Sequence, residues 1–325
     1  MSGSEGWSIP PILQPRPEAC AFDLEAALGS VLRLRAEVPP DAFTASILGT
    51  EREGSAVLLE GGRHALTIGY LITEAERVWL ATAGGAVVEA HPLGYDFATG
   101  FGLLLLLGRL PARGLPIGSA ERLRPADPVI LAACGGRAAA VQARLIGKRE
   151  FAGYWEYLLE EALFTAPAHP HWGGAACIGP DGRLVGIGSL LIETEAGREE
   201  TAAANMVVPI DLFVPIREEL ARQGRVARPP RPWLGLYVVE AGDRLVVSGV
   251  APRGPAEKAG IRRGDLIVAV AGRAVVDLAD LWRKVWALGE AGVVVPLLTV
   301  RDGQRFDRTL RSIDRASLMR RPSLH

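Results

Sequence analysis

Apolar residues occur along the first two thirds of this chain in short runs, and turn-forming residues interrupt them. Turn signals such as Glu60–Gly62, Ala83–Gly85 and Pro180–Gly182 separate neighbouring runs. Many short runs with Gly and Pro punctuation are typical of an all-β sandwich or a pair of barrels. The predicted strands are Ala56–Leu59, Ala65–Ile72, Val78–Thr82, Val87–Leu93, Phe101–Leu107, Pro128–Ala133, Ala138–Ile146, Tyr157–Phe164, Ala175–Ile178, Leu184–Ile192 and Asn205–Pro209. We therefore expect a mainly β fold.

The domain boundaries follow from changes in this pattern. Residues 1–30 begin with a Pro-rich stretch and predict an irregular arm, and the β-rich region covers residues 31–223. That region closes with a predicted helix over Ile210–Gln223, which ends at Gly224. Residues 224–232 mix Pro and Arg and predict an extended linker.

Residues 233–314 predict a second, smaller α+β domain, and residues 315–325 a tail. Two helical patterns, Pro255–Ala259 and Leu278–Leu288, lie among its strands, and Arg301–Gln304 is a hairpin signal. Its predicted strands are Leu245–Val250, Leu266–Val270, Val293–Val300 and Arg305–Leu310.

Composition adds little chemistry to this outline. Hydrophobic residues make up 49% of the 325 residues and the formal net charge is −1, so no strong field favours nucleic acid as a partner. The three cysteines, Cys20, Cys134 and Cys177, have no CxxC spacing, which argues against a disulfide framework or a structural zinc. We expect no cofactor and no metal.

The longest aliphatic run, Leu103–Leu107, is far shorter than the roughly 20 residues that a membrane-spanning helix needs. Residues 1–15 show no basic start followed by an apolar stretch, the mark of a secretory signal. On these grounds we expect no membrane span and a cytoplasmic location.

Five segments carry recognisable motifs, in order and with nearly gap-free spacing: Gly54–Leu59, Ala65–Ile72, Asp96–Leu104, Pro170–Ala176 with its sequel Asp181–Gly188, and Asn205–Ile210. Together they resemble the motifs of the HtrA/DegP-like proteases. The resemblance covers roughly residues 45–314. It implies a chymotrypsin-like double β-barrel followed by a PDZ domain.

The same resemblance implies that the Ser-His-Asp triad has been replaced. The nucleophile position holds Trp172, the general-base position Tyr70, and the position of the orienting carboxylate Gly100. Triad chemistry needs an activatable hydroxyl, an imidazole and a buried carboxylate. Pro170 stands where the family has an oxyanion-hole donor, and proline has no N–H. These residues predict a catalytically inactive homologue, a pseudo-protease that is not an enzyme.

Two other features near Trp172 are more simply explained as structural than as catalytic. His169 and His171 could form a metal pair or a relocated base, but an isolated i, i+2 pair is more typical of a loop. Cys177 lies on a predicted core strand, so a buried inert thiol is favoured over a substitute nucleophile. The aromatic residues Tyr70, Phe101 and Trp172 either fill the former cleft or line a reused ligand site.

The C-terminal domain resembles PDZ domains more fully. Val250–Ala256 and Ala259–Ile267 resemble, almost residue for residue, the family's segment Pro-Ala-x-x-Ala-Gly-Leu-x-x-Gly-Asp-x-Ile. Such domains add a peptide strand to a sheet edge and hold its carboxylate with backbone N–H groups. The peptide-binding positions that the resemblance implies are Trp233, Leu234, Gly235, Leu236, Tyr237, Val238, Leu281 and Val285.

The resulting functional hypothesis is a scaffold or regulator in protein quality control that binds protein or peptide C-termini through its PDZ domain. The alternative is an active serine-type endopeptidase. A homo-trimer, or a mixed oligomer with an active paralogue, is compatible with either. The aromatic cluster Tyr154–Tyr157 fits a core or a recognition surface equally well.

Overall fold

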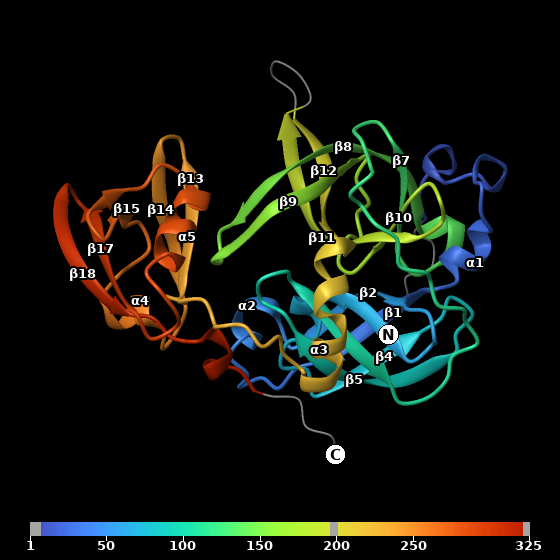
Figure 1. Cartoon of the computed structure of the whole chain (residues 1–325), viewed down its shortest axis with the longest axis horizontal. Coiled ribbons are helices and arrows are strands. Elements are labelled where there is room, and N and C mark those ends of the chain that lie inside the picture. Colours follow the sequence, from blue (N-terminus) through green and yellow to red (C-terminus); the bar gives the residue numbers. More distant parts are fainter. Residues whose placement is uncertain (1–7, 196–200, 321–325) are drawn as a thin grey trace. The chain divides into compact units, whose positions relative to one another are not determined.

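The computed structural model describes residues 8–195 and 201–320 and consists mainly of β-strands (Figure 1). The described residues form two compact units. The first contains residues up to Arg149, Glu161–Val226 and the chain from Arg320 onward; the second contains Glu150–Glu160 and Ala227–Met319. Residues 150–160 join the C-terminal unit, although they lie within the region 31–223 along the chain.

A closed six-stranded barrel opens the first unit, with the strand order β1-β2-β3-β6-β5-β4. Its strands are β1 (Val31–Glu37), β2 (Glu51–Leu58), β3 (His64–Ile68), β4 (Arg77–Ala81), β5 (Val87–Tyr95) and β6 (Phe101–Leu106). In β1, Leu32, Leu34 and Ala36 are fully buried while Arg33 and Arg35 are exposed, which is the alternation of a half-buried strand.

A second closed barrel follows, with the order β10-β11-β12-β9-β8-β7. Its strands are β7 (Pro128–Ala132), β8 (Ala140–Gly153), β9 (Tyr157–Ala166), β10 (Ala176–Ile178), β11 (Leu184–Glu195) and β12 (Thr201–Pro209). The buried side chains of Leu131, Val141, Leu163, Cys177 and Val207 fill its interior. The two barrels confirm the double-barrel fold that the sequence predicts.

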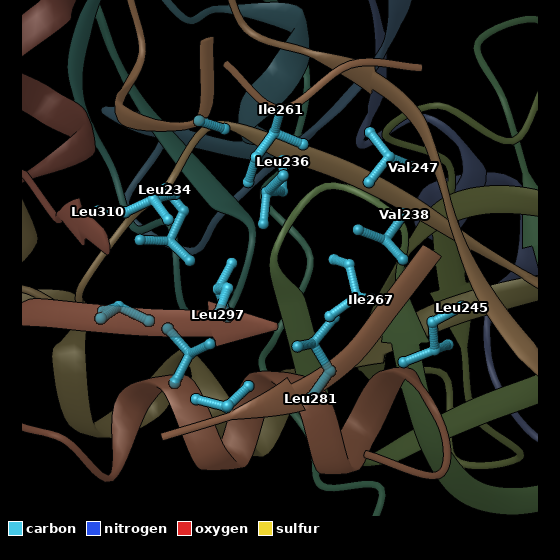
Figure 2. Packing of buried hydrophobic residues seen from close by; sticks show 14 of the residues in the cluster. Leu234, Leu236, Val238, Leu245, Val247, Ile261, Ile267, Leu281, Leu297 and Leu310 are labelled. Atoms are coloured by element: carbon cyan, nitrogen blue, oxygen red, sulfur yellow. The ribbon is translucent and has the colours of Figure 1, made fainter. Parts of the chain in front are cut away.

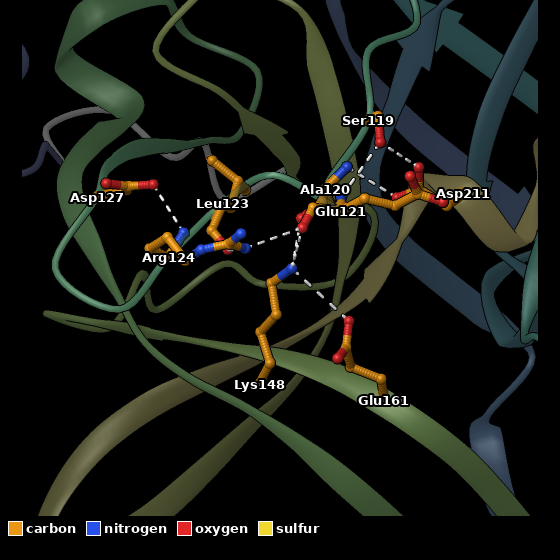
Figure 3. A network of polar contacts seen from close by, with 9 residues as sticks. All are labelled: Ser119, Ala120, Glu121, Leu123, Arg124, Asp127, Lys148, Glu161 and Asp211. Carbon is orange, nitrogen blue, oxygen red and sulfur yellow. Dashed lines mark hydrogen bonds and ion pairs between the residues drawn. The ribbon is translucent and has the colours of Figure 1, made fainter.

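A polar network ties the segment before β7 to the second barrel (Figure 3). Asp211 accepts from the Ser119 hydroxyl at 2.5 Å and from the Ala120 N–H at 2.8 Å. The Lys148 ammonium donates to the Ala120 carbonyl at 2.6 Å and lies 3.7 Å from the Glu161 carboxylate. Because Lys148 and Glu161 flank residues 150–160, this network anchors the base of the β8–β9 hairpin.

Short helices complete the first unit: α1 (Leu24–Leu28), α2 (Ala45–Leu48) and α3 (Arg217–Gln223). The helix predicted over 210–223 is continuous only in α3, because Ile210–Leu212 and Val214–Ile216 form separate 3-10 turns around Pro215. Gly224 ends α3 at φ +70°, donating its N–H to the Leu220 carbonyl at 3.0 Å.

The second unit is a six-stranded sheet with two helices, α4 (Pro255–Lys258) and α5 (Leu278–Trp286). Its strands are β13 (Leu236–Ala241), β14 (Arg244–Val250), β15 (Leu266–Val270), β16 (Arg273–Ala274), β17 (Val294–Arg301) and β18 (Gln304–Arg311). Figure 2 shows its core, in which Leu234, Leu236 and Val238 pack with Leu281 and Leu297. Asp302 and Gly303, both at positive φ, close the predicted hairpin between β17 and β18.

In the part of the chain that the structure describes, no helix is long and apolar enough to cross a membrane.

Candidate functional site

Tyr70, Gly100 and Trp172 lie on loops of the first unit that approach one another. Tyr70 follows β3 in a 3-10 turn, Gly69–Leu71. The Gly69 N–H donates to the Gly100 carbonyl at 2.7 Å, and Gly100 itself has φ +87°. The structure therefore places the loop after β3 against the loop before β6.

The Tyr70 side chain is a half-buried hydrogen-bond donor. Its hydroxyl donates to the Ser189 carbonyl, with an O–O distance of 2.9 Å. Burial raises the pKa of the phenol above its usual value, and a side-chain hydrogen bond from Trp172 opposes this shift only in part. Tyr70 is thus protonated at neutral pH and cannot accept a proton as a general base.

The Trp172–Gly174 loop lies between the two barrels of the first unit. The Ser55 N–H of β2 donates to the Gly173 carbonyl at 2.8 Å, and the Gly174 N–H donates to the Gly188 carbonyl of β11 at 2.9 Å. Gly174 has φ +77°, and a Cβ there would stand 1.8 Å from the Ser55 carbonyl oxygen. Only glycine fits this close approach.

His169 is part of the same loop's framework. Its Nδ1 accepts from the His171 N–H at 3.0 Å, so the proton is on Nε2, which donates to the Ala139 carbonyl at 2.9 Å. The Asn205 side chain accepts from the His169 N–H at 2.6 Å and donates to its carbonyl at 3.1 Å. Burial lowers the pKa of the imidazole to about 4. His169 is a neutral, buried residue that shapes the backbone beside Pro170.

The surroundings of the histidine pair and of Cys177 differ: His171 is exposed, whereas His169 and Cys177 are buried. Among the described residues, no group of three or more His, Cys, Asp or Glu side chains is arranged to hold a metal ion. Cys177 is fully buried in β10, and burial raises the pKa of its thiol to about 12. The thiol is therefore un-ionised and inaccessible, as expected of a core cysteine.

A buried arginine supports the backbone under Tyr70. The Arg52 guanidinium donates to the Tyr70 and Thr73 carbonyls, both at 2.8 Å, and to the Thr44 hydroxyl at 2.8 Å. The Glu74 carboxylate accepts from the Thr44 hydroxyl at 2.7 Å and from the Thr44 N–H at 2.7 Å. Sequence reasoning missed this network, because Arg52 and Glu74 are separated along the chain and are linked through Thr44 only in the fold.

In the second unit, the segment Trp233–Leu236 presents backbone N–H groups to a carboxylate. Hereafter we call this segment the carboxylate loop. The Leu234 N–H lies 3.0 and 3.1 Å from the two Glu156 carboxylate oxygens, and the Leu236 N–H lies 2.8 Å from one of them. The Gly235 N–H also donates to this carboxylate, and Gly235 has φ +75°. The loop conformation is that of an anion-binding nest.

The remaining predicted peptide-binding residues surround the carboxylate loop. Tyr237 and Val238 lie on β13, the edge strand of the sheet. Leu281 and Val285 lie on α5 and are fully buried in the core of the second unit. Sequence reasoning missed Glu156, although the aromatic cluster Tyr154–Tyr157 marked its segment.

Two family models match the chain. The model of the trypsin-like peptidase domain matches residues 54–187, and that of the PDZ domain matches residues 246–288. The first match contains Tyr70, Gly100 and Trp172, and the second contains α5. Both domains that the sequence resemblance implies are therefore present.

Curated relatives point the same way. DegS, a serine endoprotease of Escherichia coli strain K12, is 27% identical over 266 residues, which cover 78% of this chain and 74% of DegS. A probable periplasmic serine endoprotease of Pseudomonas putida strain W619, named DegP-like, is 24% identical over 266 residues. That match covers 78% of this chain and 54% of the relative, so the chain spans about half the length of the DegP-like relatives.

Solved structures share the fold. The HtrA-type protease AlgW with tripeptide superposes with a TM-score of 0.53 at 20% identity, covering 95% of this chain and 99% of that one. The serine endoprotease from Yersinia pestis gives a TM-score of 0.50 at 23% identity, covering 90% and 96%.

These comparisons correct two sequence-based expectations. The expectation that the chain is not an enzyme is wrong, because the curated relatives are named serine endoproteases and point to a protease. It rested on the residue types at four positions, Tyr70, Gly100, Trp172 and Pro170. The expectation of a cytoplasmic location is also wrong, because the DegP-like relatives are named periplasmic. It rested on the composition of the first residues, which carries no physical information about where a folded domain resides.

Proposed function

Because this chain is a member of the HtrA/DegP-like peptidases with a PDZ domain, we propose that it captures extended peptides by their free C-terminal carboxylate. The observation that supports this proposal is the carboxylate loop, whose N–H groups converge on one anion. Leu234 and Leu236 donate to it at 2.8–3.1 Å, and Gly235 donates as well. Charge-assisted hydrogen bonds of this kind are roughly twice as strong as neutral ones.

The strand that follows the carboxylate loop supplies the second part of the proposed peptide site. β13 is an edge strand, so a peptide can extend the sheet along it by backbone hydrogen bonds. We propose that the peptide site consists of Trp233, Leu234, Gly235, Leu236, Tyr237 and Val238, with α5 as its second wall. Leu281 and Val285, fully buried on α5, would then give the side-chain pocket its apolar floor.

The test is a titration of the full chain with fluorescent peptides of one sequence that end in a hydrophobic residue. One peptide has a free C-terminal carboxylate and the other a C-terminal amide. We expect the amide to bind at least about tenfold more weakly, because it presents no anion to the carboxylate loop. Equal affinity for both peptides, or no binding of either by the wild type and by Glu156→Gln, would reject the proposal.

Endopeptidase activity is the second candidate function, favoured by the names of the curated relatives. We propose that the family's triad positions correspond here to Tyr70, Gly100 and Trp172, and its oxyanion-loop position to Pro170. If so, peptide-bond hydrolysis by this chain needs a nucleophile at another position, since an indole carries no nucleophilic oxygen.

Casein turnover and fluorophosphonate labelling of the purified chain test this second function, both with and without a C-terminal peptide. Turnover together with labelling of one serine would support it, and mass spectrometry would locate the nucleophile. Turnover no greater than that of heat-denatured protein, under both conditions, would reject it.

We also propose a periplasmic location, in line with the DegP-like relatives, and assembly into a homo-oligomer or a mixed oligomer with a paralogue. Light scattering of the purified chain gives the mass of a homo-oligomer. A monomeric mass at micromolar concentration would reject self-assembly.

A further inference from the structure

The tip of the β8–β9 hairpin, Glu150–Glu160, belongs to the second unit although its strands come from the second barrel. It contacts both elements that bound the proposed peptide site. On one side the Val238 N–H of β13 donates to the Tyr154 carbonyl at 2.9 Å. On the other, the Trp282 indole N–H of α5 donates to the Gly153 carbonyl at 3.1 Å. The tip therefore occupies the position in which a peptide would lie.

The Glu156 side chain fills the anion position of the carboxylate loop. Each of its two oxygens lies about 3 Å from the Leu234 N–H, at 3.0 and 3.1 Å, and one also lies 2.8 Å from the Leu236 N–H. Glu156 is 8% exposed, so the carboxylate is removed from water and depends on these donors. A buried carboxylate held by backbone N–H groups is the arrangement that a peptide C-terminus would form.

The backbone of the tip reproduces the rest of a bound peptide. Tyr154, whose carbonyl accepts from Val238, precedes Glu156 by two residues, just as Val238 follows Leu236 by two. This two-residue step matches the repeat of a strand added to a sheet edge. The tip thus combines the carboxylate contact with the backbone pairing that define this mode of peptide binding.

Contacts with α5 fasten the tip further. The guanidinium of Arg283 forms ion pairs with Glu150 and Glu160, one on each arm of the hairpin. Ala152 packs against the buried core of the second unit. Because the ion pairs are partly exposed, they contribute little to affinity and mainly orient the hairpin.

The tip is held in shape by its own side chains. The Trp155 and Tyr157 rings stack with centroids 5.4 Å apart, and the Tyr154 ring meets Tyr237 of β13 edge-on at 6.1 Å. Glu156 has φ +62°, a left-handed conformation that is unfavourable for a residue with a side chain. An unfavourable backbone conformation persists where surrounding contacts hold it in place, and here the hydrogen bonds from the carboxylate loop to Glu156 do so.

We propose that Tyr154–Glu156 is a built-in ligand of the PDZ domain, in which the Glu156 side-chain carboxylate stands in for a peptide C-terminus. This inference rests on the proposed peptide function. An incoming peptide with a free C-terminal carboxylate binds by displacing the tip, so occupancy of the peptide site is coupled to release of the β8–β9 hairpin. The ligand that displaces the tip is an extended polypeptide C-terminus.

The experiment measures the affinity of the same free-carboxylate peptide for the full-length wild type, Glu156→Gln and Glu156→Ala. Glu160→Gln, which removes a carboxylate from the same hairpin outside the carboxylate loop, is the matched control. If the tip competes, only molecules whose tip is undocked can bind the peptide, so the apparent association constant is proportional to the fraction of such molecules. We expect Glu156→Ala, which removes the acceptor of the Leu234 and Leu236 N–H groups, to bind the peptide about tenfold more tightly or better, and Glu160→Gln to bind within about twofold of the wild type. Glu156→Gln, whose neutral amide can still accept from these N–H groups, separates the loss of charge from the loss of the acceptor.

Hydrogen exchange of the wild type provides a second readout that needs no variant. Saturating free-carboxylate peptide should speed the exchange of amides in residues 150–160, while the amide of Val238 stays protected by the new ligand. If all four proteins bind the peptide with equal affinity and exchange in the tip is unchanged, the built-in ligand is rejected and the peptide function stands. If none of them binds any free-carboxylate peptide, the peptide function itself fails.

Discussion

At the scale of single residues, Tyr70 and Glu156 show how position decides what a side chain does. Tyr70 is half-buried and Glu156 is buried, and the polar group of each is paired with backbone of a distant segment: Tyr70 with the Ser189 carbonyl and Glu156 with the carboxylate loop. A buried polar group without such a partner costs about 1–3 kcal/mol. Each pairing therefore fixes the loop that carries it.

Tyr70→Phe tests whether this hydroxyl is structural. Removing it leaves the Ser189 carbonyl without its 2.9 Å partner, so we expect the free energy of unfolding to fall by about 1 kcal/mol. Because the Tyr70 phenol is protonated and is not a general base, any casein turnover by the chain should be unchanged. Urea denaturation measures the first effect, and a turnover loss greater than about tenfold would assign Tyr70 a catalytic role instead. Tyr154→Phe, at a half-exposed tyrosine, is the control for the loss of a phenol oxygen.

At the scale of elements, the agreement between sequence and structure is uneven. Strands with alternating or continuous apolar patterns, such as Phe101–Leu106 and Leu184–Glu195, lie close to their predicted positions because burial on a sheet imposes the pattern. β1 is not among the predicted strands, because Arg33 and Arg35 alternate with its leucines and leave no continuous apolar run. The predicted helix over 210–223 is longer than the observed one, because the spacing of apolar residues carries no sign of the turn at Pro215.

Arg52→Lys tests the network that joins β2, the turn after β3 and the residue before α2. A planar guanidinium reaches the Tyr70 carbonyl, the Thr73 carbonyl and the Thr44 hydroxyl at once, whereas a lysine ammonium cannot serve all three. We expect the free energy of unfolding to fall by about 2–3 kcal/mol, because at least one buried acceptor loses its donor.

Chemical denaturation of the full chain measures this change. Arg35→Lys on β1 is the matched control, since that side chain is half exposed and its ion pairs with Glu37 and Glu51 should be worth under about 1 kcal/mol. Equal stability of the two variants would contradict the structural role of Arg52.

At the scale of the whole molecule, the β8–β9 hairpin contributes residues to both units of the chain. Its base is anchored by Lys148 and Glu161 in the first unit, and its tip lies in the proposed peptide site of the second. Any ligand that displaces the tip therefore acts on strands that belong to a barrel.

The same hairpin predicts a pH dependence of peptide binding. Burial raises the pKa of the Glu156 carboxyl to about 7, against the opposing effect of the loop N–H groups and of Arg315; Tyr237 is the other titratable group facing it. The displaced tip is exposed and its carboxyl has an ordinary pKa near 4.3. Between pH values of about 4.3 and 7, docking of the tip is therefore accompanied by uptake of a proton on Glu156. Docking is favoured fully below the lower pKa and loses this contribution as pH rises toward 7.

We accordingly expect the affinity of the wild type for a free-carboxylate peptide, divided by that of Glu156→Gln, to rise by about tenfold or more from pH 5 to pH 7. Titrations with a fluorescent peptide at several pH values measure this change. Dividing by the affinity of Glu156→Gln removes the titration of the peptide's own carboxyl, which meets the same loop N–H groups in both proteins. A parallel dependence in both proteins would assign the effect to another group.

Order along the chain was enough to identify the two domains, because the barrels and the PDZ sheet impose local patterns of burial and tight turns on their own segments. The resemblance to PDZ domains singled out Trp233–Leu236 as a peptide-binding segment, which stays a prediction, and the structure adds that Gly235 there has φ +75°. The pairings of Arg52 with the Tyr70 turn, of Tyr70 with Ser189 and of Glu156 with Leu234 and Leu236 join residues far apart in the chain. Such contacts exist only once the strands are packed, because a side chain's burial and partners depend on its neighbours in space. For this reason the built-in ligand became visible in the folded molecule and not in the order of its residues.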